Sequence, residues 1–407
     1  MRERALRAIA ECRHIATMSE QPGRITRRFL TAPVGDVHAH LRGRMEALGM
    51  TVRVDAAGNL RGLWQPAGTN GKRLVMGSHI DTVPDAGAFD GVLGVMLAIE
   101  LVGVAQALDL PLAIEVIAFS EEEGVRFGVP FLGSRAAAGR FDAALLALTD
   151  SEGVTLERAI RGFGLDPGKV SEAEADESAI GFFEIHIEQG PVLEAEGLSV
   201  AAVTVIVGQT RLSLEFGGHA NHAGTTPMRL RRDALAAAAE WISGVESRAR
   251  RTDGLVATVG EIVVWPNAAN VIPGSAQVSL DIRHALDTAR TAAVKEVLAL
   301  ARTIAKRRGL SVKWKQQMDL AAVAMDARLT SSLADAIANA AFPAKTMPSG
   351  AGHDAMVMAA RVPAAMLFLR SPGGISHHPD ETVREEDVEA ALEVGRRFLE
   401  RLSTEVG

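Results

Sequence analysis

The chain contains 407 residues, which is too long for one ordinary hydrophobic core, so two domains are expected. Its formal net charge of −7 and pI of about 5.9 argue against nucleic acid or an anionic membrane as a partner. A single cysteine, Cys12, excludes an intramolecular disulfide bond and a cysteine-rich metal site. The charged N-terminus lacks the apolar core of a signal peptide, and Glu100 interrupts the longest apolar stretch, residues 91–108. We therefore expect a soluble, cytoplasmic protein without a membrane span.

The first half of the chain alternates between predicted strands and helices. The region before residue 50 is predicted to be helical, and an apolar helix is predicted to run from Asp90-Gly91 through Leu108. Strands are predicted at residues 51–55, 60–64, 74–78, 112–119, 181–187 and 200–207, and a further helix at 134–148. This order predicts an α/β domain in which helices flank the sheet.

Residues 206–325 follow a different pattern, in the order strand, helix, strand, strand, helix, strand. The strands are predicted at residues 211–216, 255–264, 276–284 and 310–315, and the helices at 229–249 and 287–308. This order is the split βαβ motif, which forms a compact α+β, ferredoxin-like domain. The α/β pattern then resumes, with a helix at 329–341, a strand at 364–369 and a closing helix at 385–401. We therefore expect residues 206–325 to be inserted into a first domain formed by residues 1–205 and 326–407.

Polar side chains gather where the strands of the first domain end. They are His79, Asp81, Asp90, Glu122 and Glu123, together with the stretches 186–189 and 377–381. Ligands bind at the carboxyl edge of open α/β sheets, and this mixture of imidazole and carboxylate groups suits zinc or manganese. Taken alone, residues 79–81 could be a plain loop and residues 121–123 a solvated turn. Their position after two successive strands favours a site for two metal ions, in which Asp90 is placed to bridge.

The motifs GSHIDTVP, FDG, EEEG and SHHPDE resemble those of the dinuclear metal-dependent exopeptidase and deacylase superfamily. HIEQGPVLE (186–194), GGHANHAGTTPM (217–228), NVIPG (270–274), DIR (281–283) and PSGAGHDA (348–355) narrow the resemblance. They are similar to its hydantoinase/carbamoylase branch, which contains N-carbamoyl-L-amino-acid hydrolases, β-ureidopropionases and allantoate amidohydrolases. The resemblance covers nearly the whole chain and implies a metallo-exopeptidase-like catalytic domain with a mixed sheet, and an inserted lid and dimerisation domain.

The resemblance also implies roles for individual residues. The metal ligands would be His79 and His186 for one divalent ion, Glu123 and His377 for the other, and Asp90 between them. Asp81 would orient His79, and Glu122 would be the general base. His222 would contact the transition state, either across a closing cleft or from the partner subunit of a homodimer. Residues expected to bind substrate are Gln209, Asn270, Arg283, Gly352 and His353.

Two ligand assignments have competing candidates in the sequence. Glu121, Glu122 and Glu123 are three consecutive carboxylates, and we assign roles to the two that directly precede Gly124. His377 and His378 are adjacent imidazoles, and the family pattern places the ligand directly after the serine. Relatives often carry asparagine where this chain has His378, so that residue could orient a ligand, contact substrate or lie on the surface.

The expected activity is hydrolysis of a C–N bond in a ureido or N-carbamoyl acid. The matching family position of Arg283 binds the substrate carboxylate with its planar fork, while His222 and Asn270 would hold the ureido group, which fits allantoate and an N-carbamoyl-L-amino acid alike. The resemblance of residues 22–36 and of the polar pocket residues makes allantoate the first candidate substrate. For a lone arginine, a surface charge at a strand end would be the default interpretation. The alternatives are an N-carbamoyl-L-amino-acid hydrolase or β-ureidopropionase, an aminoacylase or dipeptidase, and a metal-binding protein without turnover.

Overall fold

The computed structural model describes residues 1–67, 69 and 71–406, and it divides into two compact units. The first unit comprises Met1–Thr204 and Met325–Gly407, and the second comprises Val205–Ala324. The chain leaves and re-enters the first unit at neighbouring positions, because the main-chain N–H of Met325 donates to the carbonyl of Thr204 at 2.9 Å. The boundaries expected from the sequence, residues 206–325, are shifted by one residue from this division.

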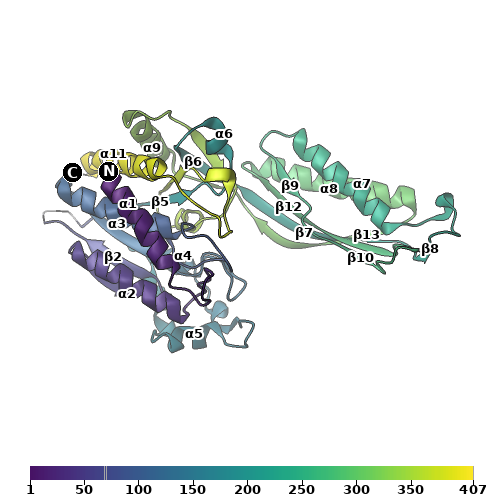
Figure 1. The fold of residues 1–407 in the computed structure, drawn as a ribbon, viewed down its shortest axis with the longest axis horizontal. Helices are drawn as coiled ribbons and strands as arrows, with labels where there is room; N and C mark the ends of the chain where they lie inside the picture. Colours follow the sequence, from purple (N-terminus) through teal and green to yellow (C-terminus); the bar gives the residue numbers. More distant parts are fainter. Residues whose placement is uncertain (68, 70, 407) are drawn as a thin grey trace. The chain divides into compact units, whose positions relative to one another are not determined.

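The first unit is a mixed sheet covered by helices (Figure 1), which confirms the predicted fold class. Its strands are β1 (Thr51–Val54), β2 (Leu60–Trp64), β3 (Arg73–His79), β4 (Ala113–Phe119), β5 (Ala179–Ile187), β6 (Val200–Ile206), β15 (Thr346–Ser349) and β16 (Ala364–Leu369). They lie in the order β1-β2-β4-β3-β5-β16-β6, and β15 also pairs with β6. The short strand β14 (Val323–Ala324) pairs with the last residues of β6. The four central strands, β4, β3, β5 and β16, run parallel, so their carboxyl ends meet at one edge.

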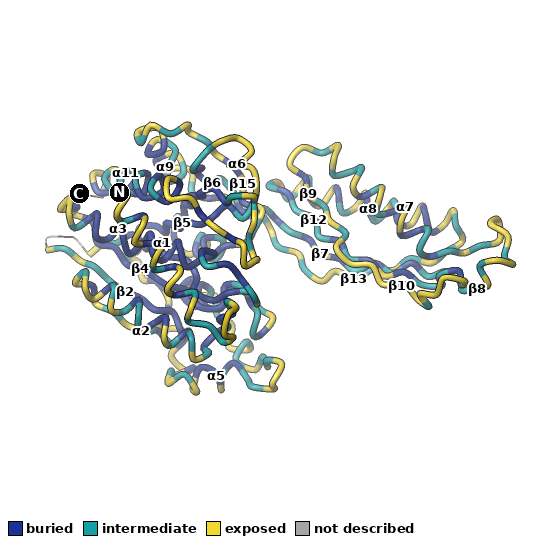
Figure 2. Tube along the Cα trace, in the orientation of Figure 1, coloured by how far each residue is buried: buried dark blue, intermediate teal, exposed yellow. Residues whose placement is uncertain are grey.

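Helices surround this sheet, and they include the apolar helix that the sequence places after Gly91. They are α1 (Arg2–Ala16), α2 (Ala32–Ala47), α3 (Val92–Ala107), α4 (Leu132–Ala137), α5 (Leu156–Gly162), α6 (Val192–Glu196), α9 (Ala327–Asn339), α10 (Asp354–Met358) and α11 (Glu385–Val406). Helix α3 packs against β3, β5, α1 and α11 and is buried almost throughout (Figure 2). Its one charge, Glu100, is 3% exposed and accepts hydrogen bonds from Arg4 and Arg7 at 2.9 and 2.7 Å. Of the helices in the described residues, none is long and apolar enough to cross a membrane.

The prediction of one helix over residues 134–148 is wrong. Helix α4 ends at Ala137, and a separate 3-10 turn follows at Ala143–Ala147. Gly139 lies between them with a φ of +68°, in the left-handed region that commonly ends a helix. The small residues that suggested a continuous helix therefore include its stop signal.

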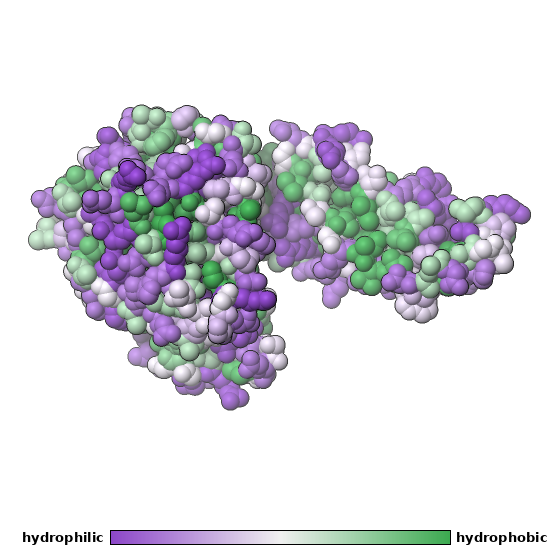
Figure 3. All heavy atoms as spheres, in the orientation of Figure 1, coloured by the Kyte–Doolittle hydropathy of each residue, from purple (hydrophilic) through white to green (hydrophobic). Residues whose placement is uncertain are grey.

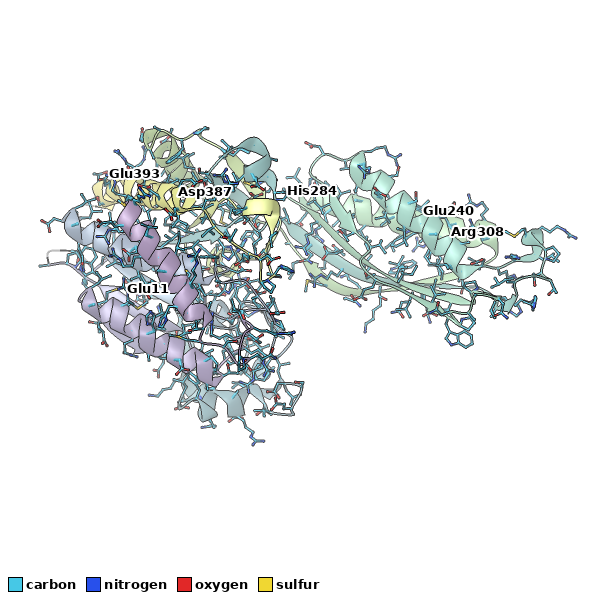
Figure 4. All side chains as sticks on the ribbon, in the orientation of Figure 1. Glu11, Glu240, His284, Arg308, Asp387 and Glu393 are labelled. Carbon is cyan, nitrogen blue, oxygen red and sulfur yellow. The ribbon has the colours of Figure 1, made fainter. Side chains whose placement is uncertain are left out.

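The second unit has one antiparallel sheet in the order β10-β12-β7-β13, in which β12 lies between β7 and β10. Its strands are β7 (Gly208–Gly217), β8 (Asn221–His222), β9 (Val256–Thr258), β10 (Ile262–Trp265), β11 (Val271–Ile272), β12 (Ser275–His284) and β13 (Ser311–Leu320). Helices α7 (Ala234–Arg250) and α8 (Asp287–Arg308) pack against each other and against the sheet. Glu240 of α7 accepts two hydrogen bonds from Arg308 of α8, at 2.9 and 2.8 Å (Figure 4).

The prediction of one continuous strand at residues 255–264 is also wrong. Strands β9 and β10 both pair with β12, but residues 259–261 lie opposite only two residues of β12, Ser279 and Leu280. Ser279 anchors this bulge, because its hydroxyl accepts the N–H of Glu261 at 3.0 Å and its N–H donates to the carbonyl of Glu261 at 3.1 Å. One extra residue on one strand interrupts the ladder without ending the pairing.

Candidate metal centre and active site

The candidate site lies at the carboxyl edge of the central parallel strands. His79 is the last residue of β3, and it lies beside Phe119, the last residue of β4. His186 is the penultimate residue of β5, in register with Phe368 of β16. The three glutamates follow β4, and the His377 loop follows β16. The strand order therefore brings together side chains that are separated by nearly 300 positions in the sequence.

Gly91 allows the loop that carries Asp90 to pass close to His79. Its φ is +69°, and a Cβ atom at this position would lie 2.5 Å from three atoms of the His79 ring. Real Cβ atoms do not approach other atoms so closely, so any other residue here would displace either the ring or the loop.

Asp90 is the centre of the cluster. Its Oδ1 lies 3.2 Å from Nε2 of His186 and 3.7 Å from Nε2 of His79, and its Oδ2 lies 3.2 Å from Nε2 of His377. Nε2 of His377 is in turn 3.5 Å from Oε1 of Glu123. One oxygen of Asp90 thus lies near His79 and His186, and the other lies near His377, which is next to Glu123. This is the arrangement expected of a carboxylate that bridges two metal ions.

The chemistry of these residues fits divalent cations. Groups in which one atom from each residue lies within 4.8 Å of the others include His79, Asp90 and His186, and also Asp90, Glu123 and His377. Oδ1 of Asp90 is buried and has no hydrogen-bond partner of acceptable geometry among the described residues. A buried carboxylate oxygen without a partner is costly, and a cation between Asp90 and the imidazoles would satisfy it.

Main-chain carbonyls set the orientation of both buried imidazoles. Nδ1 of His79 lies 3.0 Å from the carbonyl oxygen of Asp81, and Nδ1 of His186 lies 2.9 Å from that of Ile187. Each ring can therefore donate its Nδ1–H outward, which leaves the lone pair of Nε2 directed toward Asp90.

The carboxylate of Asp81 lies beside His79, as expected, and also contacts the glutamate loop. It lies 3.7 Å from His79 and accepts the main-chain N–H groups of Glu122 and Glu123, both at 3.0 Å. Two aligned N–H donors stabilise a buried carboxylate better than one distant imidazole does. Asp81 thus joins the β3 loop to the glutamate loop, and its carbonyl oxygen orients the His79 ring.

The three consecutive glutamates separate into different environments. Glu121 points away from the cluster, and its carboxylate accepts N–H groups of Arg126, Phe127 and Phe29 at 2.8, 3.3 and 3.3 Å. Glu122 and Glu123 form a candidate ligand group with His79. The exposed His378 accepts the N–H of Asp380 at 3.2 Å, which is the surface alternative considered for it.

Crowding of charges shifts the acid–base properties of the site. Burial raises the pKa of Glu122 well above its usual range, and the neighbouring Glu123 and Asp354 carboxylates raise it further. Burial and the Asp90 carboxylate raise the pKa of Glu123 to about 8. Burial opposes ionisation of Asp90, but the imidazoles of His186 and His377 hold its pKa well below the usual range. Among these groups, Glu122 has the strongest tendency to hold a proton.

Three further residues hold Asp90 in place; two of them, Gln189 and Glu381, lie in the polar stretches expected at the site, but the sequence indicated no individual role for any of the three. Gln189 and Ser376 donate to Oδ2 of Asp90 at 2.9 and 3.2 Å. Glu381 accepts the N–H groups of Phe89 and Asp90 at 2.9 and 3.0 Å. All three lie inside the HIEQG and SHHPDE motifs. Their polar side chains close to the predicted ligands in sequence were the only feature that could have indicated a role at the site.

His353 and Gly352 lie next to the cluster in the first unit. The buried His353 ring is centred 4.4 Å from the ring of His186, and its Nε2 lies 3.0 Å from the hydroxyl of Ser349. A Cβ atom on Gly352 would lie 3.0 Å from the ring of Phe131, so this residue is closely packed. The structure therefore brings these two expected substrate residues beside the expected metal ligands.

The other expected substrate residues belong to the second unit, where they form two separate pairs. Gln209 and Arg283 are cross-strand neighbours and both donate to Asp281, Gln209 at 2.7 Å and Arg283 at 2.8 and 2.9 Å. His222 and Asn270 lie beyond the opposite ends of the same strands, on the β8–β11 pair and directly before it. Strand β7 alone spans eight residue steps from Gln209 to Gly217, which is roughly 26 Å at about 3.3 Å per residue. One small substrate cannot contact both pairs within a single copy of this unit.

Comparison with known proteins agrees with the motifs. Residues 75–401 match the model of peptidase family M20/M25/M40. Allantoate deiminase 1 of Glycine max is 38% identical over 97% of this chain and 89% of its own length, and N-carbamoyl-L-amino acid amidohydrolase of Geobacillus stearothermophilus is 37% identical over 93% and 94%. A solved amidase of the hydantoinase/carbamoylase family from Burkholderia multivorans superposes with a TM-score of 0.91 at 30% identity, covering 98% of this chain and 97% of that one. The chain therefore belongs to peptidase family M20/M25/M40, and within it to the amidohydrolases that resemble the hydantoinase/carbamoylase enzymes.

Proposed function

We propose that this protein hydrolyses a C–N bond of a ureido acid, with allantoate as its first candidate substrate and two divalent metal ions, zinc or manganese, as cofactors. The observation that carries the proposal is the pair of ligand groups that share the Asp90 carboxylate, with Glu122 buried beside them. The names of the relatives support the substrate class, because they include allantoate deiminases and N-carbamoyl-L-amino acid amidohydrolases.

Glu122 is the proposed general base. Bound metal ions would supply a water molecule of lowered pKa, and Glu122 accepts the proton that this water loses. Burial and neighbouring carboxylates raise the pKa of Glu122 well above its usual range, which suits a group that donates a proton to the leaving nitrogen. Divalent cations beside Glu122 would lower this pKa, so that the ionised carboxylate could first accept the proton of the water. Hydrolysis of a ureido group in this way yields an amine and carbamate, which decomposes to ammonia and carbon dioxide.

Arg283 and Gln209 are proposed to bind the carboxylate of the substrate. Asp281 fixes both side chains on adjacent strands by accepting hydrogen bonds from each. The sequence offered no role for Asp281, although it lies in the DIR motif. A substrate carboxylate would meet a guanidinium whose orientation is already set, which reduces the entropy lost on binding.

The inserted unit is proposed to close over the site and to mediate a homodimer. Strand β7 spans roughly 26 Å between Gln209 and Gly217 at about 3.3 Å per residue, and His222 and Asn270 lie beyond the Gly217 end, which favours supply of His222 by a second copy of the chain. Strand β10 offers a surface for that copy, because it lies at the edge of its sheet with Val263 and Trp265 exposed by 64% and 67%. Figure 3 shows hydrophobic surface, in green, on the visible face of this unit.

Mixing two inactive variants tests whether the site is shared between copies. If Glu122 of one copy acts with His222 of the other, Glu122→Gln and His222→Ala should complement each other when they form mixed dimers. Random exchange would make about a quarter of all sites wild type, so about a quarter of the activity should return. No recovery, in a mixture shown to have exchanged subunits, would place His222 and Glu122 of one copy in the same site.

The substrate itself is tested by a panel on the metal-loaded enzyme. Ammonia release should be fastest with allantoate, and the panel should include N-carbamoyl-L-amino acids and N-carbamoyl-β-alanine. A preference for either of these would select the N-carbamoyl-L-amino-acid hydrolase or the β-ureidopropionase. Cleavage of dipeptides or N-acyl amino acids without cleavage of any ureido acid would overturn the proposed substrate class.

A further inference from the structure

Residues 25–29 form a short segment between α1 and α2 that touches two loops of the candidate metal centre. One is the loop between His79 and Asp90, and the other is the glutamate loop that follows β4. We call residues 25–29 the clamp segment. It lies outside residues 75–401, which match the family model, and none of the roles described above involves it.

The first set of contacts fixes the loop between His79 and Asp90. The clamp segment forms a two-way bridge with Thr82, because the N–H of Arg27 donates to the Thr82 hydroxyl and the N–H of Thr82 donates to the carbonyl of Arg27, both at 3.0 Å. Two further N–H groups of this loop bind the segment. Asp85 donates to the hydroxyl of Thr26 at 3.1 Å, and Ala86 donates to the carbonyl of Ile25 at 2.8 Å.

The second set of contacts fixes the glutamate loop. The N–H of Phe29 donates to Oε2 of Glu121 at 3.3 Å, and the carbonyl of Phe29 accepts a hydrogen bond from Arg126 at 2.6 Å. Glu121 directly precedes Glu122 and Glu123. One segment of five residues therefore joins the loop of two proposed ligands to the loop of the third ligand and the base.

The Arg27 guanidinium lies beneath the turn that carries His79. The side chain is 1% exposed, and its Nε donates to the carbonyl of Ile80 at 2.5 Å. Its Nη1 donates to the carbonyls of Met18 and Ile15 at 3.0 and 3.3 Å. No carboxylate of the described residues lies within 4.0 Å of the guanidinium, so carbonyl dipoles hold this buried cation in place.

A buried cation without a direct ion pair needs a compensating interaction. The Asp81 carboxylate supplies one, because its negative charge favours the protonated form of Arg27. Burial acts in the opposite direction and lowers the pKa of Arg27 to about 10. The same attraction acts on the carboxylate of Asp81, which directly follows Ile80 in the chain. Arg27 binds the carbonyl of the residue between His79 and Asp81, so it acts on position and on charge at the same point of the chain.

We propose that Arg27 is a positioning residue that sets the turn at residues 79–82 for metal binding, and that the clamp segment couples this turn to the glutamate loop. The inference rests on the proposed metal-dependent function. It predicts that losing the contacts of the clamp segment with these two loops weakens metal binding without removing any ligand.

The test measures metal affinity by competition with a chelator. Arg27→Met should weaken binding by about 10- to 100-fold, the range found when groups that orient metal ligands are lost. Arg27→Lys keeps the charge but lacks the planar fork, so it should recover part of the loss. The matched control is Arg28→Met, because among the described residues the Arg28 side chain hydrogen-bonds with Glu20 and with neither loop. The control should bind metal as the wild type does.

A second variant keeps the test decisive if Arg27→Met fails to fold. Thr82→Val retains the shape of the side chain and removes the hydroxyl that accepts the N–H of Arg27, and it should weaken metal binding by about fivefold. The visible spectrum of the cobalt-substituted protein gives an independent readout, which should shift in Arg27 and Thr82 variants and remain unchanged in Arg28→Met. Loss of thermal stability alone would not change this spectrum.

Asp90→Ala separates failure of this inference from failure of the proposed function. If Asp90→Ala keeps full metal content, the metal centre itself is misassigned. If Asp90→Ala loses metal while Thr82→Val and any folded Arg27 variant bind it with wild-type affinity and spectrum, the metal centre stands and the positioning role of Arg27 is overturned.

Discussion

Oε1 of Glu381 accepts the main-chain N–H of Asp90 at 3.0 Å, although the two residues are 291 positions apart. Oε2 of the same carboxylate accepts the hydroxyl of Ser376 at 3.1 Å, and that hydroxyl also lies 3.2 Å from Oδ2 of Asp90. Glu381 therefore fixes both the backbone and the side-chain environment of the central carboxylate. The loop between β16 and α11, which carries Glu381, thus holds Asp90 in place in the loop between β3 and α3.

Replacing Glu381 should weaken metal binding even though this residue is not a proposed ligand. Glu381→Ala leaves the N–H groups of Phe89 and Asp90 without their acceptor, so the proposed bridge can move. We expect metal affinity to fall by about 10- to 100-fold in a chelator competition assay. Asp380→Ala is the control, since the Asp380 side chain is exposed and adjacent in sequence. Equal affinities in the two variants would show that Glu381 does not support Asp90.

Glu122→Gln should remove the proposed base and preserve the metal centre. The amide cannot take the proton from water, so kcat should fall by about 10²- to 10⁴-fold. Metal content and the unfolding midpoint are the controls, and both should match the wild type. A variant that retains most of its turnover would exclude Glu122 as the base and direct attention to Glu123.

Arg283→Ala should impair binding of the substrate carboxylate. A hydrogen bond to a charged group contributes about 1.5–3 kcal/mol, so kcat/KM should fall by about 10- to 150-fold, mainly through KM. Arg211→Ala is a matched control, because Arg211 also donates to Asp281, at 2.9 Å, but has no proposed contact with substrate. A similar loss in both variants would mean that the effect arises from Asp281 and not from an anion site at Arg283.

His38 should make the stability of the first unit depend on pH. Burial, together with the nearby charge of Arg42, lowers the pKa of His38 from 6.5 to about 4. In the unfolded chain His38 therefore becomes protonated below pH 6.5, whereas in the folded chain it stays neutral until the pH falls to about 4. Stability is fully present above pH 6.5 and is lost as the pH falls toward 4, by about 3 kcal/mol from this group.

Urea unfolding of His38→Leu at several pH values measures this contribution. The variant should lose less stability than the wild type between pH 6.5 and 4, the interval between the two pKa values. His14→Gln is the control for replacing a histidine of the same unit, since His14 lies exposed on α1. Parallel curves for the wild type and His38→Leu would contradict the prediction.

The sheet and the ligand cluster could be predicted because both depend on local patterns. Apolar runs of strand length fix β3, β4, β5 and β16, and a parallel arrangement brings their carboxyl ends to one edge. His79, Glu123 and His186 lie at these ends, so their convergence follows from the topology alone. Gly91 could be expected near the site from its motif, but its contact with the His79 ring could not.

Other features depend on how loops meet, which the sequence pattern does not encode. The Asp81 carboxylate was expected to orient His79, but its hydrogen bonds with the N–H groups of Glu122 and Glu123, which come from a different loop, could not be foreseen. The bulge at residues 259–261 adds one residue to a β-rich stretch that otherwise matches a single strand. The separation of His222 from Arg283 arises from the length of β7 and β12, which motif matching does not measure.

The hydrogen bond between Met325 and Thr204 gives the inserted unit the topology of a detachable module. Its two ends emerge from the first unit as adjacent strands, so a tight turn could reconnect Thr204 to Met325 without moving the strands that carry His79 and His186. The entropy of closing such a loop grows only with the logarithm of its length, so a long insertion costs the first unit little more than a short one. The inserted unit, with the residues proposed to bind substrate, could therefore be replaced as a whole while the metal centre keeps its geometry. The same catalytic domain could in this way acquire a different substrate.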